Sequence, residues 1–331
     1  EAGFDPQRLA AAVAFARASA SRAHTRVELA PIPPASGDYS APMERDPVAV
    51  PLEEKIALCL RAEEGMRRAE VKITEATVRA MGELRVFRSS EGANVTQRFV
   101  ECGGGIDALA VSGDGRVQNR SYPSAHGGSS AQTGWEFVES LGLDREAPRV
   151  GEEAAALLTA PACPSGTTTI VVDAEQMVLQ VHESVGHPTE LDRVYGTEAA
   201  YAGTSFLKAD DLGSLRYGSE HMNITADPTT ALGLGTFGWD DEGSPARRQP
   251  VVEGGVLTGY LASRETSALI DVMQHSHRAQ AAAVPRCNAP DSPSRRYSDS
   301  ALNSKPLGHA SAPSSMKALE KNSRARSGSV M

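Results

Sequence analysis

The stretch of the chain that decides its fold runs from Thr168 to Leu191: TTIVVDAEQMVLQVHESVGHPTEL. Its opening residues, 168–172, are a β-branched run that predicts a short strand. Asp173 then stands at a helix N-cap position, and Gln176 follows at the spacing of a capping box. Apolar residues at three- and four-residue steps come next and predict an amphipathic helix with a buried stripe. They are Ala174, Met177, Val178, Val181 and Val185.

Three residues of this stretch have the side chains of a metal site: His182, Glu183 and His187, in the pattern H-E-x-x-x-H. In the common H-E-x-x-H helix, two histidines four residues apart share a face and bind zinc, and the glutamate activates water. Here the histidines are five residues apart. At about 100° per residue, the second imidazole of a regular helix would point about 140° away from the first.

Two local distortions would bring the histidines together. A π-bulge, with its i→i+5 hydrogen bond, would restore a shared face. Alternatively, the helix would loosen at Gly186, with Pro188 blocking its regular continuation. The competing interpretation is two unrelated histidines at a helix end beside a surface glutamate, and the spacing alone does not decide between these interpretations.

Two longer blocks carry a resemblance to a known family. HESVGHPTELDRVYGTEAAYAGTSFL, residues 182–207, resembles the metallopeptidase subunit of the TldD/PmbA family, once called DNA gyrase modulators. WDDEGSPARRQPVVEGGVLTGYLASRETSALI, residues 239–270, resembles the same family's second block. With the region before these blocks, the resemblance extends over residues 71–270.

The resemblance implies a zinc-dependent peptidase acting on extended or unfolded peptides. In that family pattern His182 and His187 bind Zn²⁺, and Glu183 is the general base. The resemblance also implies a protein partner, either a homologous PmbA/TldE-type subunit without the motif, forming a heterodimer, or a second copy in a homodimer. The competing hypothesis is a non-catalytic or decayed subunit that lacks a complete zinc site.

The family's third zinc ligand, a cysteine, has no match in this chain. Glu190 and Asp192 follow the motif, and each is a candidate third ligand or a partner that holds a histidine ring by its far nitrogen. For Asp192 the favoured interpretation is a solvated carboxylate. The other possible replacements are Cys287, His275 and His277, and the sequence favours none of them.

The composition limits the function classes. A chain of 331 residues has room for two domains, and a net charge of −9 argues against nucleic acid as a direct partner. No apolar run is long enough to span a membrane. Four widely spaced cysteines without a CxxC pair predict reduced thiols and a cytoplasmic protein. Because the chain starts at Glu1 rather than Met, the sequence leaves open whether a targeting segment lies upstream.

The fold class predicted is α+β, with N-terminal helices packed on an antiparallel sheet. Helices are expected at 5–22 and 51–69, joined by an extended linker at 31–51. In the second helix, five side chains are expected to face the interior: Leu52, Ile56, Cys59, Leu60 and Met66. Five short strands are expected between residues 71 and 119, separated by turns at 90–92, 103–105 and 112–115.

A second, mostly-β domain is expected to be entered through the metal-binding helix. Before it, residues 149–159 predict a short helix with Pro148 in its first turn. Strands are expected at 224–227 and 235–239, an acidic turn at 240–243, and a hairpin about Gly254-Gly255. His126 and His221 are interpreted as solvated residues.

The chain changes character after Ile270. The last 61 residues contain 12 Ser and five Pro, with nine basic against four acidic residues. Low hydrophobicity with many Ser, Pro and Arg predicts disorder. The domains expected are therefore an N-terminal α+β domain at 1–163, an incomplete metallopeptidase domain at 164–270, and a divergent, truncated or frameshifted tail at 271–331.

Overall fold

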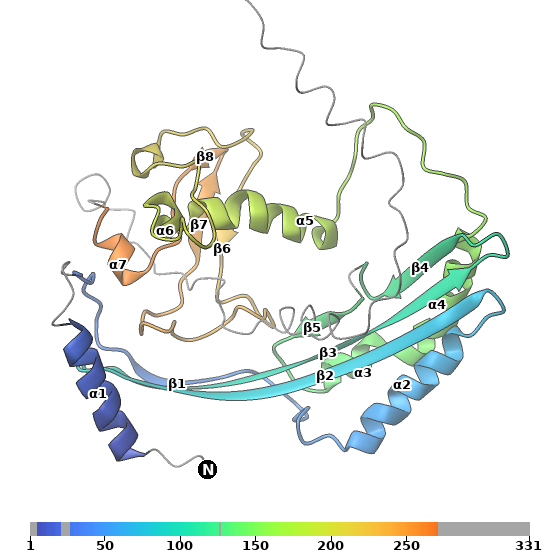
Figure 1. Ribbon diagram of the computed structural model, residues 1–331, viewed down its shortest axis with the longest axis horizontal. Helices are drawn as coiled ribbons and strands as arrows, with labels where there is room; N and C mark the ends of the chain where they lie inside the picture. Colours follow the sequence, from blue (N-terminus) through green and yellow to red (C-terminus); the bar gives the residue numbers. More distant parts are fainter. Residues whose placement is uncertain (1–4, 21–26, 126, 271–331) are drawn as a thin grey trace, which may run out of the picture. The chain divides into compact units, whose positions relative to one another are not determined.

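The computed structural model describes residues 5–20, 27–125 and 127–270 (Figure 1). The first helix, α1 (Pro6–Ala20), confirms the helix expected there. The predictions for His126 and for the tail, with its candidate ligands His275, His277 and Cys287, lie outside the described residues.

A five-stranded sheet dominates the first half of the chain. Its strands are β1 (Ser36–Ser40), β2 (Val71–Arg88), β3 (Asn94–Val111), β4 (Val117–Tyr122) and β5 (Ser129–Ala131). β3 is central: β2, β4 and β5 pair with it antiparallel, and β1 pairs with it parallel. The expected linker at 31–51 was therefore wrong for residues 36–40, because β1 gains its hydrogen bonds from a strand more than fifty residues later in the chain.

The number and length of the strands also differ from expectation. β2 and β3 have 18 residues each, where several shorter strands with a turn at 103–105 were predicted. The glycine triplet lies inside β3. A Cβ added at Gly103 would stand 2.3 Å from the Ser129 carbonyl oxygen, and one at Gly105 would stand 2.0 Å from the Gly127 carbonyl oxygen. Glycine is needed here because another backbone approaches closely.

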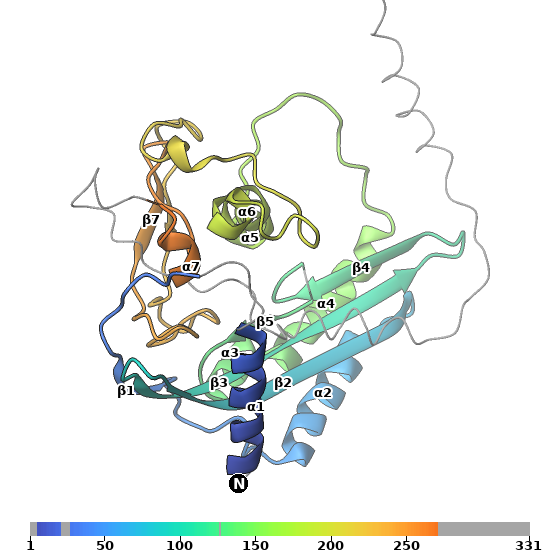
Figure 2. The same cartoon turned by 60° about the vertical axis from the view of Figure 1, so that its left-hand side comes forward.

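Three helices accompany this sheet: α2 (Leu52–Met66), α3 (Glu136–Leu141) and α4 (Leu143–Leu157). α2 and α4 pack together against the long strands (Figure 1, Figure 2). The core between them contains Ala62, Met66, Ile106, Leu143 and Val150. The α+β fold class is therefore confirmed.

The face that α2 buries agrees only in part with the predicted one. Met66 is fully buried and Cys59 is partly buried, as predicted. Leu52, Ile56 and Leu60 are exposed instead, and Ala62 is fully buried although it was not predicted to be. The contact with α4 is too close for large side chains, since a Cβ at Gly151 would stand 2.1 Å from the Met66 carbonyl oxygen. Small residues therefore form the seam between these helices.

The start of α4 also corrects a prediction. α4 begins at Leu143 instead of residue 149, so Pro148 lies inside the helix. Gly142, with φ of +58°, ends α3 and separates it from α4. The left-handed conformation at this position explains why two helices can follow each other directly.

The strand predicted at 168–172 does not form. Val171 is 95% exposed, and these residues have no strand beside them in the part of the chain that the structure describes. A β-branched run is a strand only when another strand supplies its hydrogen bonds. The buried stripe of the next helix is also wrong: α5 (Ala174–Val181) has no buried residue, and of the five predicted positions only Val185, beyond its end, is buried.

A second sheet follows, with β6 (Ile224–Ala226), β7 (Gln249–Glu253) and β8 (Val256–Leu257). The hairpin about Gly254-Gly255 is confirmed, with positive φ at both glycines. Residues 235–239 are not a strand; their backbone is held instead by the Gln97 side chain, which bonds Gly238 and Trp239. The acidic turn is confirmed, with the Asp240 carboxylate accepting from two backbone N–H groups.

Four further short helical segments lie in the described part: the 3₁₀ turns at His187–Thr189 and Ala209–Asp211, α6 (Leu191–Val194) and α7 (Arg264–Ser267). The core around the second sheet contains Val185, Leu191, Leu207, Val252 and Leu257. Across the described residues, no helix combines the length and the apolar composition needed to traverse a bilayer.

Candidate metal centre

The helix that carries H-E-x-x-x-H starts as its local sequence predicts. The Asp173 carboxylate accepts a hydrogen bond from the Gln176 N–H at 3.1 Å, which confirms the N-cap. Capping of this kind satisfies one of the N–H groups that a helix start leaves free. The cap thereby defines the start of α5 at Ala174, eight residues before the first histidine of the motif.

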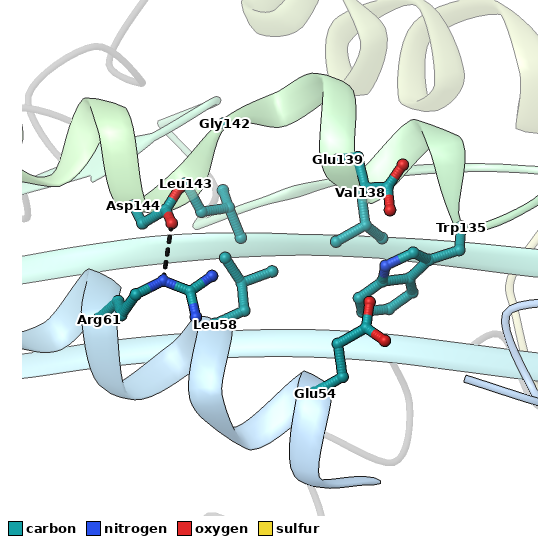
Figure 3. Close-up of a pocket in the computed structure, with 9 residues that line it drawn as sticks. All are labelled: Glu54, Leu58, Arg61, Trp135, Val138, Glu139, Gly142, Leu143 and Asp144. Carbon is teal, nitrogen blue, oxygen red and sulfur yellow. Dashed lines mark hydrogen bonds and ion pairs between the residues drawn. The ribbon is translucent and has the colours of Figure 1, made fainter. Parts of the chain in front are cut away.

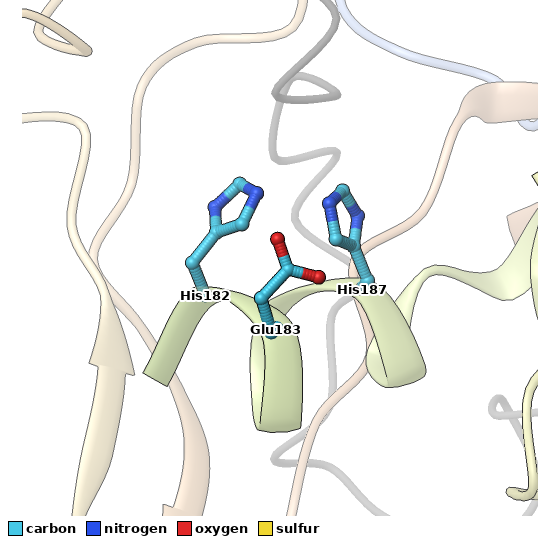
Figure 4. Close-up of side chains that lie close together, drawn as sticks. All are labelled: His182, Glu183 and His187. Atoms are coloured by element: carbon cyan, nitrogen blue, oxygen red, sulfur yellow. The ribbon is translucent and has the colours of Figure 1, made fainter. Parts of the chain in front are cut away.

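The motif itself lies in a π-turn. Residues His182–Gly186 form the π-helix, and the N–H of His187 donates to the carbonyl oxygen of His182, five residues back. Of the two distortions considered, the π-bulge is therefore the one that forms. It brings the two imidazoles to one side, with ring centroids 4.3 Å apart and ring planes at 78° (Figure 4).

The two imidazoles and the carboxylate make one cluster. His182, Glu183 and His187 each offer a ligand atom, and these atoms lie within 4.8 Å of one another. Figure 4 shows the Glu183 carboxylate between the two rings. The histidines are half-buried and Glu183 is exposed, so an ion has access from solvent. Two nitrogens and one oxygen are a donor set that suits zinc.

Glu190 supports this cluster from beside it. The residue is only 8% exposed, and its Oε1 lies 3.0 Å from Nδ1 of His187. A carboxylate there accepts a hydrogen bond from the Nδ1–H group, which leaves the Nε2 lone pair for a metal ion. Its Oε2 accepts from Nε of Arg193 at 2.6 Å. Because both oxygens have partners, the geometry favours Glu190 as a partner of His187 over a role as the third ligand.

Asp192 is not the solvated carboxylate that was favoured. It is 6% exposed, and its Oδ1 accepts from the backbone N–H of Arg193 at 2.9 Å. Its carbonyl oxygen accepts from the Thr197 hydroxyl, also at 2.9 Å. These contacts of Asp192 therefore join it to α6 and to the loop that follows it. The cluster of metal-binding side chains does not include this residue.

Arg193 is a residue of this centre that the sequence analysis missed. Its guanidinium bonds the Glu190 carboxylate and, at 3.1 Å, the carbonyl oxygen of Ala202. The signal available in the sequence was the three-residue spacing from Glu190, at which opposite charges on a helical turn meet. That spacing is common on protein surfaces, so it did not single out this pair.

We expect Glu190→Gln to weaken metal binding by about 10- to 100-fold, the range for residues that orient a metal ligand. Glutamine has a similar shape but loses the charge that holds both the imidazole and Arg193. Competition against a chromophoric chelator would measure the affinity. The matched control is Glu220→Gln, because the carboxylate of Glu220 also lies near a histidine, 3.9 Å from the exposed His221 ring. Equal affinities in the two variants would contradict the role of Glu190.

Neither the remaining described histidine nor any described cysteine belongs to the cluster. His221 is exposed, as predicted. Cys59, Cys102 and Cys163 are free thiols. Cys102 is buried and donates to the carbonyl oxygen of Gly134 at 2.9 Å, and burial raises the pKa of this thiol to about 11. A thiol held in its protonated form is a poor metal ligand.

A pocket of about 210 Å³ lies between α2 and the α3–α4 pair (Figure 3). Its carboxylates are already paired. Glu54 and Glu139 both bind Arg45, and Asp144 accepts from Arg61 at 3.0 Å. None of its lining residues is a histidine or a cysteine, and none belongs to the metal cluster. The cluster, and not this pocket, is therefore the candidate metal site.

Comparison with known proteins adds a family relationship. The family model described as the PmbA/TldA metallopeptidase central domain matches residues 45–160. The model described as the PmbA/TldA metallopeptidase C-terminal domain matches residues 165–291. Together these two ranges cover more than half of the chain.

Individual relatives agree with these matches. Metalloprotease MJ0996 of Methanocaldococcus jannaschii is 28% identical over 228 residues, 68% of this chain and 47% of that protein. Metalloprotease slr0863 of Synechocystis is 30% identical over 264 residues, 79% of this chain and 53% of that protein. The chain thus spans about half the length of the curated relatives that it matches.

A solved structure shares the fold. The crystal structure of a proposed modulator of DNA gyrase from Bacteroides thetaiotaomicron matches with a TM-score of 0.63. The two chains are 13% identical, and the match covers 80% of this chain and 58% of the other. At this identity the similarity concerns the fold alone.

Proposed function

This chain belongs to the PmbA/TldD metallopeptidase family, and from that premise we propose that it is a zinc-dependent peptidase that cleaves extended or unfolded peptides. The single observation that carries the proposal is the π-turn, because it aligns His182 and His187 on one side of the helix next to Glu183. Without that turn, the five-residue spacing would separate the imidazoles.

In this proposal His182 and His187 hold the zinc ion. His187 would bind through Nε2, since its Nδ1 faces the Glu190 carboxylate at 3.0 Å. The two imidazole nitrogens fit zinc, and they would also bind other first-row divalent ions. The family relationship supports a metal ion at this position, and zinc is among the ions that imidazole ligands suit.

A bound zinc ion supplies Lewis-acid polarisation of a peptide carbonyl and makes a water molecule acidic near neutral pH. Glu183 accepts the proton that water loses as its oxygen adds to the carbonyl carbon. The same carboxyl group then delivers that proton to the departing amine nitrogen when the C–N bond breaks. The exposure of Glu183 allows a substrate to reach its carboxylate.

A catalytic zinc ion normally has three protein ligands and one open position. Among the described residues, His182, Glu183 and His187 make the one group of three or more metal-binding side chains. If Glu183 is the base, the third ligand must come from elsewhere, and this favours a second candidate function. The alternative is a non-catalytic subunit that keeps the fold and binds metal weakly.

We also retain two expectations as proposals. The first is a protein partner, either a homologous PmbA/TldE-type subunit or a second copy, which sedimentation analysis would reveal. The second is a cytoplasmic location, which the free thiols of the half-buried Cys59 and the exposed Cys163 support because accessible thiols persist in a reducing compartment.

Zinc content decides between the two candidate functions. We expect the purified full chain to bind one zinc ion per active site after reconstitution, and to hydrolyse an unfolded protein substrate. A chelator should abolish hydrolysis, and added zinc should restore it. If no stoichiometric zinc binds even after reconstitution, the peptidase proposal fails and the non-catalytic alternative stands.

A further inference from the structure

The metal cluster depends on a turn that is intrinsically uncommon. A π-turn is rare and occurs mostly as a single turn inside an α-helix. At Gly186 the helix also approaches its end, where carbonyl oxygens lose their partners within the helix. Contacts from outside the turn must therefore favour this geometry over a regular α-helical turn.

Side-chain hydroxyl groups supply such contacts to three consecutive carbonyl oxygens. The Thr189 hydroxyl lies 2.8 Å from the carbonyl oxygen of Val185 and 3.0 Å from that of Gly186. The Tyr217 hydroxyl donates to the carbonyl oxygen of Ser184 at 2.5 Å. Together the two side chains serve the last three residues of the π-turn, immediately before His187.

Burial makes the threonine contact important. Thr189 is 0% exposed, and Val185, whose carbonyl oxygen it contacts, is also buried. Without the hydroxyl, water could not easily replace the lost donor at this carbonyl. An unsatisfied buried acceptor is more unfavourable than the loss of an ordinary exposed hydrogen bond.

Tyr217 connects the turn to a distant part of the chain. Its backbone N–H donates to the carbonyl oxygen of Gly255 at 2.7 Å, in the β7–β8 hairpin. Its ring packs against Phe206, with centroids 5.9 Å apart. The hydroxyl is therefore held in place by two residues far from the motif: Phe206 lies 19 residues after His187, and Gly255 lies 68 residues after it.

We propose that Thr189 and Tyr217 are positioning residues that hold residues 182–186 in the π-turn and so keep the two imidazoles on one side. Neither residue is assigned a contact with substrate or metal. The consequence for metal binding rests on the proposed function, whereas the consequence for the backbone of the turn does not.

The test compares Tyr217→Phe and Thr189→Val with the unchanged full chain. Each variant removes a hydroxyl and retains the shape of the side chain. In metal-free protein, we expect amide hydrogen exchange across residues 182–190 to become about fivefold faster in each variant. In zinc titrations, we expect the dissociation constant to rise by about fivefold for each variant.

Two controls separate positioning from general destabilisation. Thr189→Ser keeps a hydroxyl and should restore exchange and affinity to near the original values. Tyr260→Phe removes a hydroxyl from the same hydrophobic core, where it donates to the Lys208 carbonyl oxygen at 2.6 Å and does not touch the π-turn. This variant should leave exchange at 182–190 unchanged.

Unchanged exchange at 182–190 in both hydroxyl-deletion variants would overturn the inference, and so would equal acceleration in Tyr260→Phe. Accelerated exchange together with a weaker zinc affinity supports it. If exchange accelerates but the unchanged chain binds no zinc, the positioning role stands and the proposed function fails.

Discussion

A chain carrying Glu183→Gln is expected to retain its metal ion while its kcat/KM for peptide hydrolysis falls by about 10²- to 10⁴-fold, the usual contribution of a general base. Glutamine keeps the size of the side chain but cannot accept a proton from water. The loss corresponds to about 3–5 kcal/mol of transition-state stabilisation. Steady-state kinetics on an unfolded substrate and metal analysis of the same sample would measure both quantities.

The control for this variant is Glu175→Gln. Glu175 lies eight residues earlier, in the first turn of α5, and is also exposed. It should change neither hydrolysis nor metal content. Unchanged hydrolysis in Glu183→Gln would show that Glu183 is not the base. Loss of metal in that variant would instead identify Glu183 as a ligand, which is the other role that its position between the two rings allows.

The second large effect is expected for His182→Ala. Zinc sites with four protein ligands have apparent binding free energies of about 10–16 kcal/mol, so one ligand contributes about 2.5–4 kcal/mol. Removal of His182 should therefore weaken zinc binding by about 10²- to 10³-fold. The side chain is only half-buried, so the fold should tolerate alanine. A chelator competition and a circular dichroism spectrum would check both statements.

His221→Ala is the matched control, because this histidine has an 89% exposed side chain and lies outside the cluster. It should bind zinc with the affinity of the unchanged chain. Equal affinities in His182→Ala and His221→Ala would mean that His182 and His187 do not share an ion, even though their rings lie 4.3 Å apart. The proposed function would then lose its main support.

The geometry also explains how a five-residue spacing can serve the purpose of the more common four-residue spacing. The π-turn places one additional residue within the helical turn, so His187 lies on the side that i+4 would occupy in a regular helix. The next residues then leave the helix through a 3₁₀ turn at His187–Thr189. Glu190 follows at once and contacts the second imidazole.

Some features followed from the sequence because their causes are local. Asp173 caps its helix by bonding an N–H three residues later, and Gly254-Gly255 forms a hairpin turn because both residues adopt positive φ. The motif residues and the family resemblance could also be identified from the order of residues alone. The π-bulge was one of two local solutions that the sequence allowed.

Other features depended on neighbours that the sequence does not place. The β-branched run at 168–172 found no strand to pair with among the described residues. The glycines at 103–105, in contrast, belong to a long strand because they pair with residues 77–79 of β2, and the close approach of residues 127–130 leaves no room for side chains at Gly103 and Gly105. Asp192 is buried, and the backbone N–H groups of Thr197 and Ser205 from the following loop donate to carbonyl oxygens of α6 beside it.

The sequence by itself therefore determined the capped helix, the three candidate site residues and the α+β class. Only the tertiary structure decided that the two imidazoles share one side, because the donors beside that turn include Tyr217, which is anchored to the Gly255 hairpin. Hydrogen bonds within a few residues can be inferred from residue type and spacing. Bonds between distant segments depend on how the whole chain packs, and the geometry of the candidate metal centre depends on both kinds.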